Sequence, residues 1–193
     1  MRRFLLVALF AIVTNVGFAQ KGKDTIVYNL PMVNGKLVYS DSVSVKGRNK
    51  IVLDSIAKKW FADKLTPYKD CCVSLPSDSN SSVFSYALLE FRAPPNSWRL
   101  VYYDYVMLVT VKIDCGDGYY KYKIYDMRFR PKSNFFNAVV QHPTNPEYLI
   151  DRYKKKKNGL LSSMPAEIIR IYLACVNTSV RNCITSLNNA MAN

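Results

Sequence analysis

The sequence predicts an α+β fold, in which an antiparallel sheet is covered on one face by helices and a helical extension follows at the C-terminus. Two hairpin signals, Asn34-Gly35 and Asp117-Gly118, separate runs in which apolar and polar residues alternate. Residues 49–65 and 165–190 instead repeat apolar residues every three or four positions, which is the period of an amphipathic helix. Strands with one helix inserted early and helices placed late are typical of an α+β sandwich.

The first elements follow from local signals. Residues 26–46 are expected to be extended around the turn at Asn34-Gly35. A helix over residues 49–65 has Asn49 as a favourable N-cap and ends before Pro67. Trp60 and Phe61 fall on its apolar side, so we expect them to pack on the sheet rather than bind a ligand. Residues 66–82 are predicted to be a polar loop.

Three longer strands are predicted over residues 83–92, 100–114 and 119–130. In the last strand the apolar positions are even-numbered up to Ile124 and odd-numbered from Met127 onward. This change of phase predicts a β-bulge near Asp126. The second strand is expected to point one set of side chains inward: Tyr103, Tyr105, Met107, Val109, Val111 and Ile113.

The C-terminal part, residues 132–193, is predicted to be a loop followed by helices over about 146–157 and 165–190. Pro165 and Glu167 suit the first turn of the last helix. This helix carries one apolar stripe, and either its own sheet or another chain would cover that stripe. Four asparagines are expected on its outer face: Asn177, Asn182, Asn188 and Asn189.

Residues 1–19 have the pattern of a secretory signal peptide. Arg2 and Arg3 precede an apolar run over residues 4–13, and Gly17-Phe18-Ala19 is a small-x-small cleavage pattern. The apolar run is shorter than the roughly 20 residues that a spanning helix needs. We therefore expect export to the periplasm, the envelope or the medium, with no transmembrane segment in the mature chain.

The chain is strongly basic, with 27 Lys and Arg against 14 Asp and Glu and a net charge of +13. Removing Arg2 and Arg3 leaves 25 cations and 14 anions, a net charge of +11. Such a charge favours an acidic partner. Export disfavours nucleic acid and favours an anionic envelope component or an envelope protein as that partner.

Enzyme motifs are missing from the sequence. The single histidine, His142, has no neighbouring cysteine or paired carboxylate, and no nucleophile elbow or Gly-rich phosphate loop is present. Asp114 and Asp117 flank a hairpin turn, where turn geometry explains them better than a cation does. We therefore expect no enzymatic activity, no cofactor and no metal.

The five cysteines, an odd number, leave at least one free thiol. Cys175 and Cys183 are separated by about 12 Å along a helix, too far to form a disulfide with each other. Most of the five are expected to be small buried hydrophobes. The five are Cys71, Cys72, Cys115, Cys175 and Cys183.

Three stretches resemble domain-of-unknown-function family 4468, whose members are exported proteins typical of Bacteroidetes. They are residues 30–40 with Val43 and Val45, the helical run over residues 57–61, and the strand over residues 118–129. The resemblance covers roughly residues 28–131. It implies a TBP-like fold for residues 20–131 and leaves residues 132–193 as the extension. The family has no established activity, so the resemblance implies no catalytic residue.

Two groups of residues are candidates for binding. Aromatic and cationic residues alternate on the last strand, and four consecutive lysines end the short helix. A half-exposed strand and a solvated helix end would explain the same patterns without function. The candidates are Tyr120, Lys121, Tyr122, Lys123, Arg128 and Arg130 on the strand, and Lys154, Lys155, Lys156 and Lys157 on the helix.

The hypothesis that these patterns favour is an exported, non-catalytic binding or protein-interaction module of the bacterial envelope. The alternative is a peripheral carrier that holds a lipid or other amphiphile between sheet and helix. The carrier predicts a cavity of several hundred Å³ under the last helix.

Overall fold

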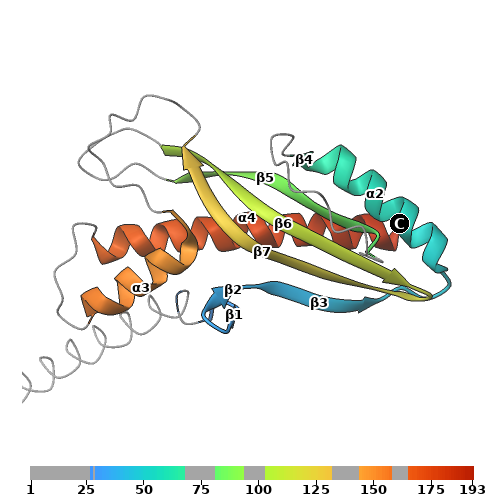
Figure 1. Cartoon of the computed structure of the whole chain (residues 1–193), viewed down its shortest axis with the longest axis horizontal. Helices are drawn as coiled ribbons and strands as arrows, with labels where there is room; N and C mark the ends of the chain where they lie inside the picture. The colour runs from blue at the N-terminus through green and yellow to red at the C-terminus, as the bar shows by residue number, and fades with distance from the viewer. Residues whose placement is uncertain (1–26, 28, 68–80, 94–102, 132–143, 158–164) are drawn as a thin grey trace, which may run out of the picture.

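The computed structural model describes residues 27, 29–67, 81–93, 103–131, 144–157 and 165–193, which build a five-stranded antiparallel sheet with helices on one face (Figure 1). The strand order is β3-β7-β6-β5-β4. The strands are β3 (Tyr39–Ser44), β4 (Thr66–Pro67), β5 (Val83–Ala93), β6 (Tyr103–Gly116) and β7 (Tyr119–Pro131). A separate short hairpin, β1 (Met32–Val33) and β2 (Lys36–Leu37), precedes β3.

Both predicted hairpin turns are confirmed. Asn34 and Gly35 join β1 to β2 with φ angles of 49° and 75°, which are left-handed conformations that Asn and Gly tolerate. Gly118, at φ 77°, closes the turn between β6 and β7. The second hairpin forms the long central ribbon of the sheet (Figure 1).

The early helix is α2 (Lys50–Lys64), within one residue of the predicted ends. The side chain of Asn49 caps it by accepting a hydrogen bond from the Val52 amide at 3.0 Å. Trp60 and Phe61 are buried against the sheet side, as expected. The Nε1 of Trp60 donates to Ser186 of the last helix at 3.1 Å, which ties the two helices together.

The predicted bulge is present at Asp126, which has a φ of 55°. Tyr125 pairs with Thr110 and Arg128 with Leu108, so that Asp126 and Met127 together oppose the single residue Val109. The extra residue resets the alternation of the strand. Met127 and Phe129 consequently return to the buried face after the break.

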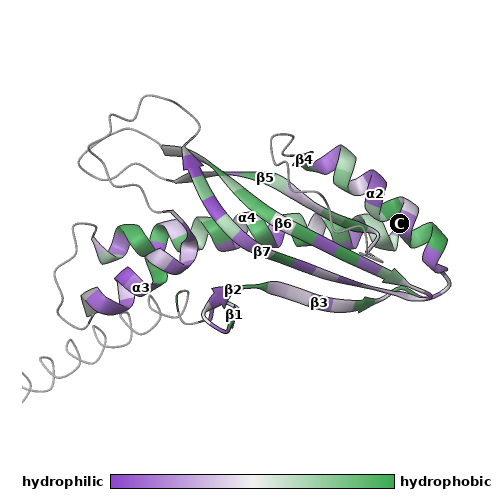
Figure 2. Cartoon of the chain, viewed as in Figure 1, coloured by the Kyte–Doolittle hydropathy of each residue, from purple (hydrophilic) through white to green (hydrophobic). Residues whose placement is uncertain are grey.

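The C-terminal helices are α3 (Pro146–Lys157) and α4 (Ala166–Ala192). Figure 2 shows apolar residues running along α4 and a polar-apolar alternation along β7. The apolar stripe of α4 belongs to the same buried cluster as the sheet, so the last helix completes the layer over its own sheet. Its buried residues are Ile169, Tyr172, Leu173, Val176, Val180, Cys183, Leu187 and Met191.

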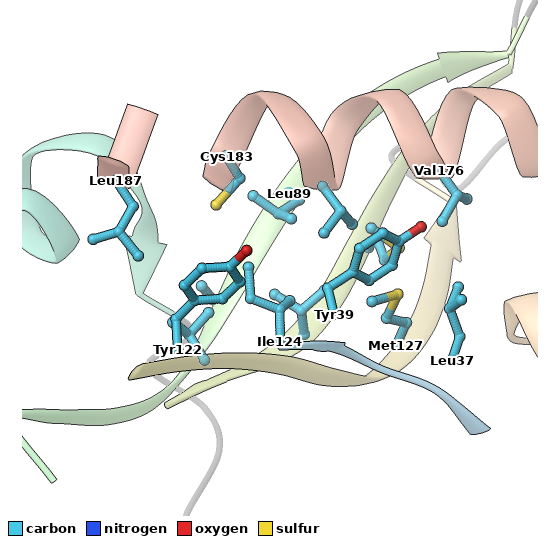
Figure 3. Packing of buried hydrophobic residues seen from close by; sticks show 14 of the residues in the cluster. Leu37, Tyr39, Leu89, Tyr122, Ile124, Met127, Val176, Cys183 and Leu187 are labelled. Atoms are coloured by element: carbon cyan, nitrogen blue, oxygen red, sulfur yellow. The ribbon is translucent and has the colours of Figure 1, made fainter. Parts of the chain in front are cut away.

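The core lies between this sheet and the helices. In Figure 3, Tyr39, Tyr122 and Met127 project from the strands toward α4, which contributes Val176, Cys183 and Leu187. The predicted inward residues of β6 from Met107 to Ile113 have no exposed surface, whereas the side chains of Tyr103 and Tyr105 lie outside the described set. The expected signal peptide, Cys71, Cys72 and His142 also lie outside the described residues. No helix among the described residues is both long and apolar enough to cross a bilayer.

Candidate functional site

One face of the sheet carries α2 and α4, and the buried cluster lies entirely on that side. We call the opposite side the open face. The strand register, and the alternation of side chains between the two faces of a strand, show which residues point to the open face. They are Ser40, Ser42 and Ser44 on β3, Phe84, Tyr86, Leu88 and Glu90 on β5, Val106, Leu108, Thr110, Lys112 and Asp114 on β6, and Tyr119, Lys121, Lys123, Tyr125, Arg128 and Arg130 on β7.

The open face is rich in cations. Its described side chains include five cations, on Lys112, Lys121, Lys123, Arg128 and Arg130, against the carboxylates of Glu90 and Asp114. Four of these cations, all on β7, are among the predicted binding residues, and all four are exposed: Lys121, Lys123, Arg128 and Arg130. Their role in binding stays a prediction.

Two like charges stand directly opposite each other at the centre of this face. Lys112 on β6 pairs in register with Lys123 on β7. Like charges in such positions lower the stability of a sheet. The Nζ of Lys112 is 3.2 Å from the carboxylate of Asp114, whereas the Nζ of Lys123 lies 4.8 Å above the ring of Tyr125. Lys121 makes a similar contact with Tyr119, at 5.7 Å.

Tyr120 and Tyr122 do not belong to the open face, so the prediction that they bind together with the lysines is wrong. Both are buried on the helix side, because residues of a strand alternate between faces. Their rings lie 6.5 Å apart, centroid to centroid, beneath α4. Burial is the main cause that raises the pKa of Tyr120 to about 12, followed by the charges of Tyr122, Asp41 and Cys115. These two tyrosines are part of the core.

Polar residues of α4 accept the hydrogen bonds that the hydroxyls of the buried tyrosines donate. The hydroxyl of Tyr39 donates to Asn177 at 2.9 Å, and that of Tyr120 donates to Asn188 at 2.6 Å. The expectation that Asn177 and Asn188 give α4 its outer polarity is therefore wrong. They accept hydrogen bonds from the sheet, since a buried phenol needs a partner.

Thr110 lies at the centre of the open face, between Tyr86 and Tyr125 in the strand register. It is 2% exposed, and its hydroxyl has no hydrogen-bond partner within the described part of the chain. Burial, together with Asp126 and Tyr86, raises the pKa of Tyr125. An unpaired buried hydroxyl costs about 1–3 kcal/mol, so Thr110 lowers the stability of the sheet at this position.

The four lysines are on α3, which packs on α4 and also contacts β2 and β7. Lys154 and Lys155 are exposed, as expected for a charged helix end, and the side chains of Lys156 and Lys157 lie outside the described set. These lysines belong to a helix on the covered side of the sheet. They form a second basic surface, separate from the open face.

The carboxylates near the β6–β7 turn have structural roles. Asp114 pairs with Lys112, and Asp117 accepts a hydrogen bond of 2.7 Å from the Lys50 amide. Asp117 thereby satisfies one free N–H group at the start of α2. No group of three or more potential metal ligands occurs among the described residues.

One polar cluster could not be found from the sequence. Ser82 hydrogen-bonds to Asp54 of α2 and accepts from the Cys115 amide at 3.2 Å, which brings together residues from three separate segments. Burial is the main cause that raises the pKa of the Cys115 thiol to about 11. A thiol that holds its proton at neutral pH is a weak nucleophile. We interpret the cluster as the attachment of α2 to the sheet.

Cavities give the carrier hypothesis no support. A cavity of about 330 Å³ lies beside the bulge and is lined by Lys36, Asp126, Arg128 and Glu147 among others. A second, about 490 Å³, lies between Trp60 and the polar side of α4. The lining of the first is mainly polar, and the second, whose lining is more apolar, lies between α2 and α4 rather than between the sheet and α4. The described side chains between the sheet and α4 form one packed cluster.

Comparisons with solved structures identify the type of fold. Neither a protein-family model nor a curated relative matches the chain. A TBP-like protein from Parabacteroides distasonis ATCC 8503 superposes with a TM-score of 0.58 at 15% identity, over 85% of this chain and 97% of its own. A DUF4468 family protein from Bacteroides ovatus ATCC 8483 gives the same TM-score at 14% identity, over 85% and 91%. The chain therefore has a TBP-like α+β fold, which is the fold that the resemblance to family 4468 implies.

Proposed function

We propose that this protein is an exported, non-catalytic binding module whose open face recognises an acidic macromolecular partner. The observation that carries the proposal is the pairing of Lys112 with Lys123 at the centre of a cation-rich face. In the protein without a partner, like charges directly opposite each other do not stabilise the sheet. An anionic group placed between them would be attracted by both.

A further feature supports the same face. Tyr119 and Tyr125 lie beneath the amino groups of Lys121 and Lys123, so aromatic and charged groups alternate over the surface. Such surfaces bind extended acidic partners through combined ionic and stacking contacts.

Heparin, a soluble polyanion, is a suitable probe. We expect Lys121→Glu with Lys123→Glu to weaken heparin binding tenfold or more, measured by fluorescence titration at 0.15 M salt. The matched control is Lys154→Glu with Lys155→Glu, which changes the net charge equally on α3 and is expected to alter binding less than threefold.

Equal losses in the two double variants would show that net charge alone drives binding, and would remove the open face as the site. Unchanged heparin binding in the variant with Lys121→Glu and Lys123→Glu would also exclude the open face as the site. All four lysines are exposed, so the variants are expected to fold, and thermal unfolding checks this.

A further inference from the structure

Exposed apolar side chains gather at one end of the molecule. Five large hydrophobic residues are exposed in the described part of the chain, and three of them lie near the β6–β7 turn: Ile51 at 78%, Val52 at 43% and Tyr119 at 42%. The other two, Met32 and Val33, are in the β1–β2 hairpin. We call residues 45–52 and 116–121 the hairpin end (Figure 1).

Hydrogen bonds fix the backbone of the hairpin end. The Gly118 amide donates to the Arg48 carbonyl at 2.8 Å, and the Gly118 carbonyl accepts from the Val45 amide at 2.8 Å. The Asp117 carboxylate accepts from the Lys50 amide, which joins the turn to the start of α2. The apolar side chains are therefore presented from a defined platform.

Ile51 and Val52 are not part of the core side of α2. The buried residues of that helix are Leu53, Ala57, Trp60 and Phe61, and Ile51 lies about 200° around the helix from Leu53. Side chains of a helix lean toward its N-terminus. As the second and third residues of α2, Ile51 and Val52 therefore lean toward the hairpin end of the molecule.

Cations surround these apolar residues. Lys46, Lys50 and Lys121 are exposed and Arg48 is half-buried, whereas Asp117 is the one carboxylate within the hairpin end. That carboxylate is bonded to the amide of Lys50. The side chains of the hairpin end therefore carry a net charge of +3, with two exposed aliphatic residues and one exposed tyrosine among them.

We propose that the hairpin end docks on an anionic lipid bilayer, with Ile51 and Val52 inserted at the boundary of headgroups and acyl chains. Basic residues around an apolar insertion are the pattern of peripheral membrane binding, and tyrosine suits the interface. Each Lys or Arg near an anionic surface strengthens binding about fivefold, which corresponds to about 1 kcal/mol. A protein partner fits less well, because a few apolar residues fall far short of the roughly 800 Å² that each side of a stable interface buries.

The test uses the chain from Gln20 onward, which contains every described residue and omits the apolar N-terminal run. Co-sedimentation is measured with vesicles of phosphatidylcholine alone and with 30% phosphatidylglycerol. The test variant is Ile51→Ser with Val52→Ser. The matched control is Met32→Ser with Val33→Ser, which removes exposed apolar surface at the other hairpin. We expect binding to the anionic vesicles alone, a loss of about tenfold or more in the test variant, and no loss in the control.

Equal binding to both vesicle types, unchanged binding of the test variant, or equal losses in the two variants would each overturn the inference. A dimer that dissociates on Ile51→Ser would also overturn it, since a second copy would then cover the patch. Heparin binding is expected to be the same in wild type and in the Ile51 and Val52 variant. The two experiments therefore test membrane docking by the hairpin end separately from binding of an acidic partner by the open face.

Discussion

The hydroxyl of Tyr120 on β7 donates a 2.6 Å hydrogen bond to Asn188 on α4, and the tyrosine has no exposed surface. The same arrangement recurs between Tyr39 on β3 and Asn177. Two phenols from neighbouring strands therefore fix the lengthwise position of α4. Apolar packing alone would constrain that position less, because hydrophobic contact has no direction.

Replacing Tyr120 by Phe tests this relationship. The change keeps the ring and leaves the Asn188 acceptor without its donor, so we expect the free energy of unfolding to fall by about 1 kcal/mol. Urea denaturation followed by circular dichroism measures it. Tyr119→Phe is the control, because its ring lies on the exposed surface. A Tyr120→Phe protein as stable as wild type would show that the bond contributes nothing.

Alkaline pH is expected to unfold the protein. Burial raises the pKa of Cys183 from 9.0 to about 12 and, as the largest cause, that of Tyr120 from 10.0 to about 12. The unfolded chain releases these protons at lower pH, so stability is fully present below pH 9 and falls as pH rises toward 12. Denaturation midpoints from pH 8 to 12 measure this. Cys183→Ala should reduce the loss of stability between pH 9 and 12. An unchanged loss would contradict a raised pKa of Cys183 as one of its causes.

Cysteine reactivity is expected to follow burial. Cys115 and Cys183 are buried free thiols, and burial is the main cause that raises the pKa of each. Alkylation by iodoacetamide at pH 8 should label both far more slowly in the native protein than in urea. Cys175 is less buried and should react sooner than Cys183. Peptide mass spectrometry resolves the sites, and rapid native labelling of Cys183 would exclude the packed arrangement.

The bulge offers a stabilising substitution. Asp126 holds a φ of 55°, which glycine adopts without steric cost. We expect Asp126→Gly to leave stability equal or raise it by up to about 1 kcal/mol, and Asp126→Val to lower it by more than that. Thermal unfolding of the two variants gives the comparison. A stabilised Asp126→Val protein would mean that the bulge does not persist.

Sequence alone predicted most of the elements, because strand alternation, turn residues and the Asn49 cap are local signals. The loop predicted over residues 66–82 was wrong at its start, where Thr66–Pro67 forms the short strand β4 by pairing with β5. The bulge at Asp126 was also predictable, since an extra residue changes the phase of a strand. Alternation likewise separated Tyr120 from Lys121, but it could not say which of the two faces the helices would cover. Asn188 on α4 and Ser82 beside Asp54 gained their roles only from contacts between distant segments, which a single sequence does not reveal.

The placement of α4 over the sheet has a consequence for how the chain matures. Tyr39 and its partner Asn177 are 138 residues apart, so their contact cannot form until most of the polypeptide has been synthesised. The pairing of β3 with β7 likewise joins residues separated by about two fifths of the chain. Synthesis proceeds from the N-terminus, and the part of the apolar side of the sheet that α4 covers therefore stays exposed until the final helix emerges. Completion of the core is a late event, and a nascent chain of this topology remains open to chaperones, proteases and transport through narrow pores until then.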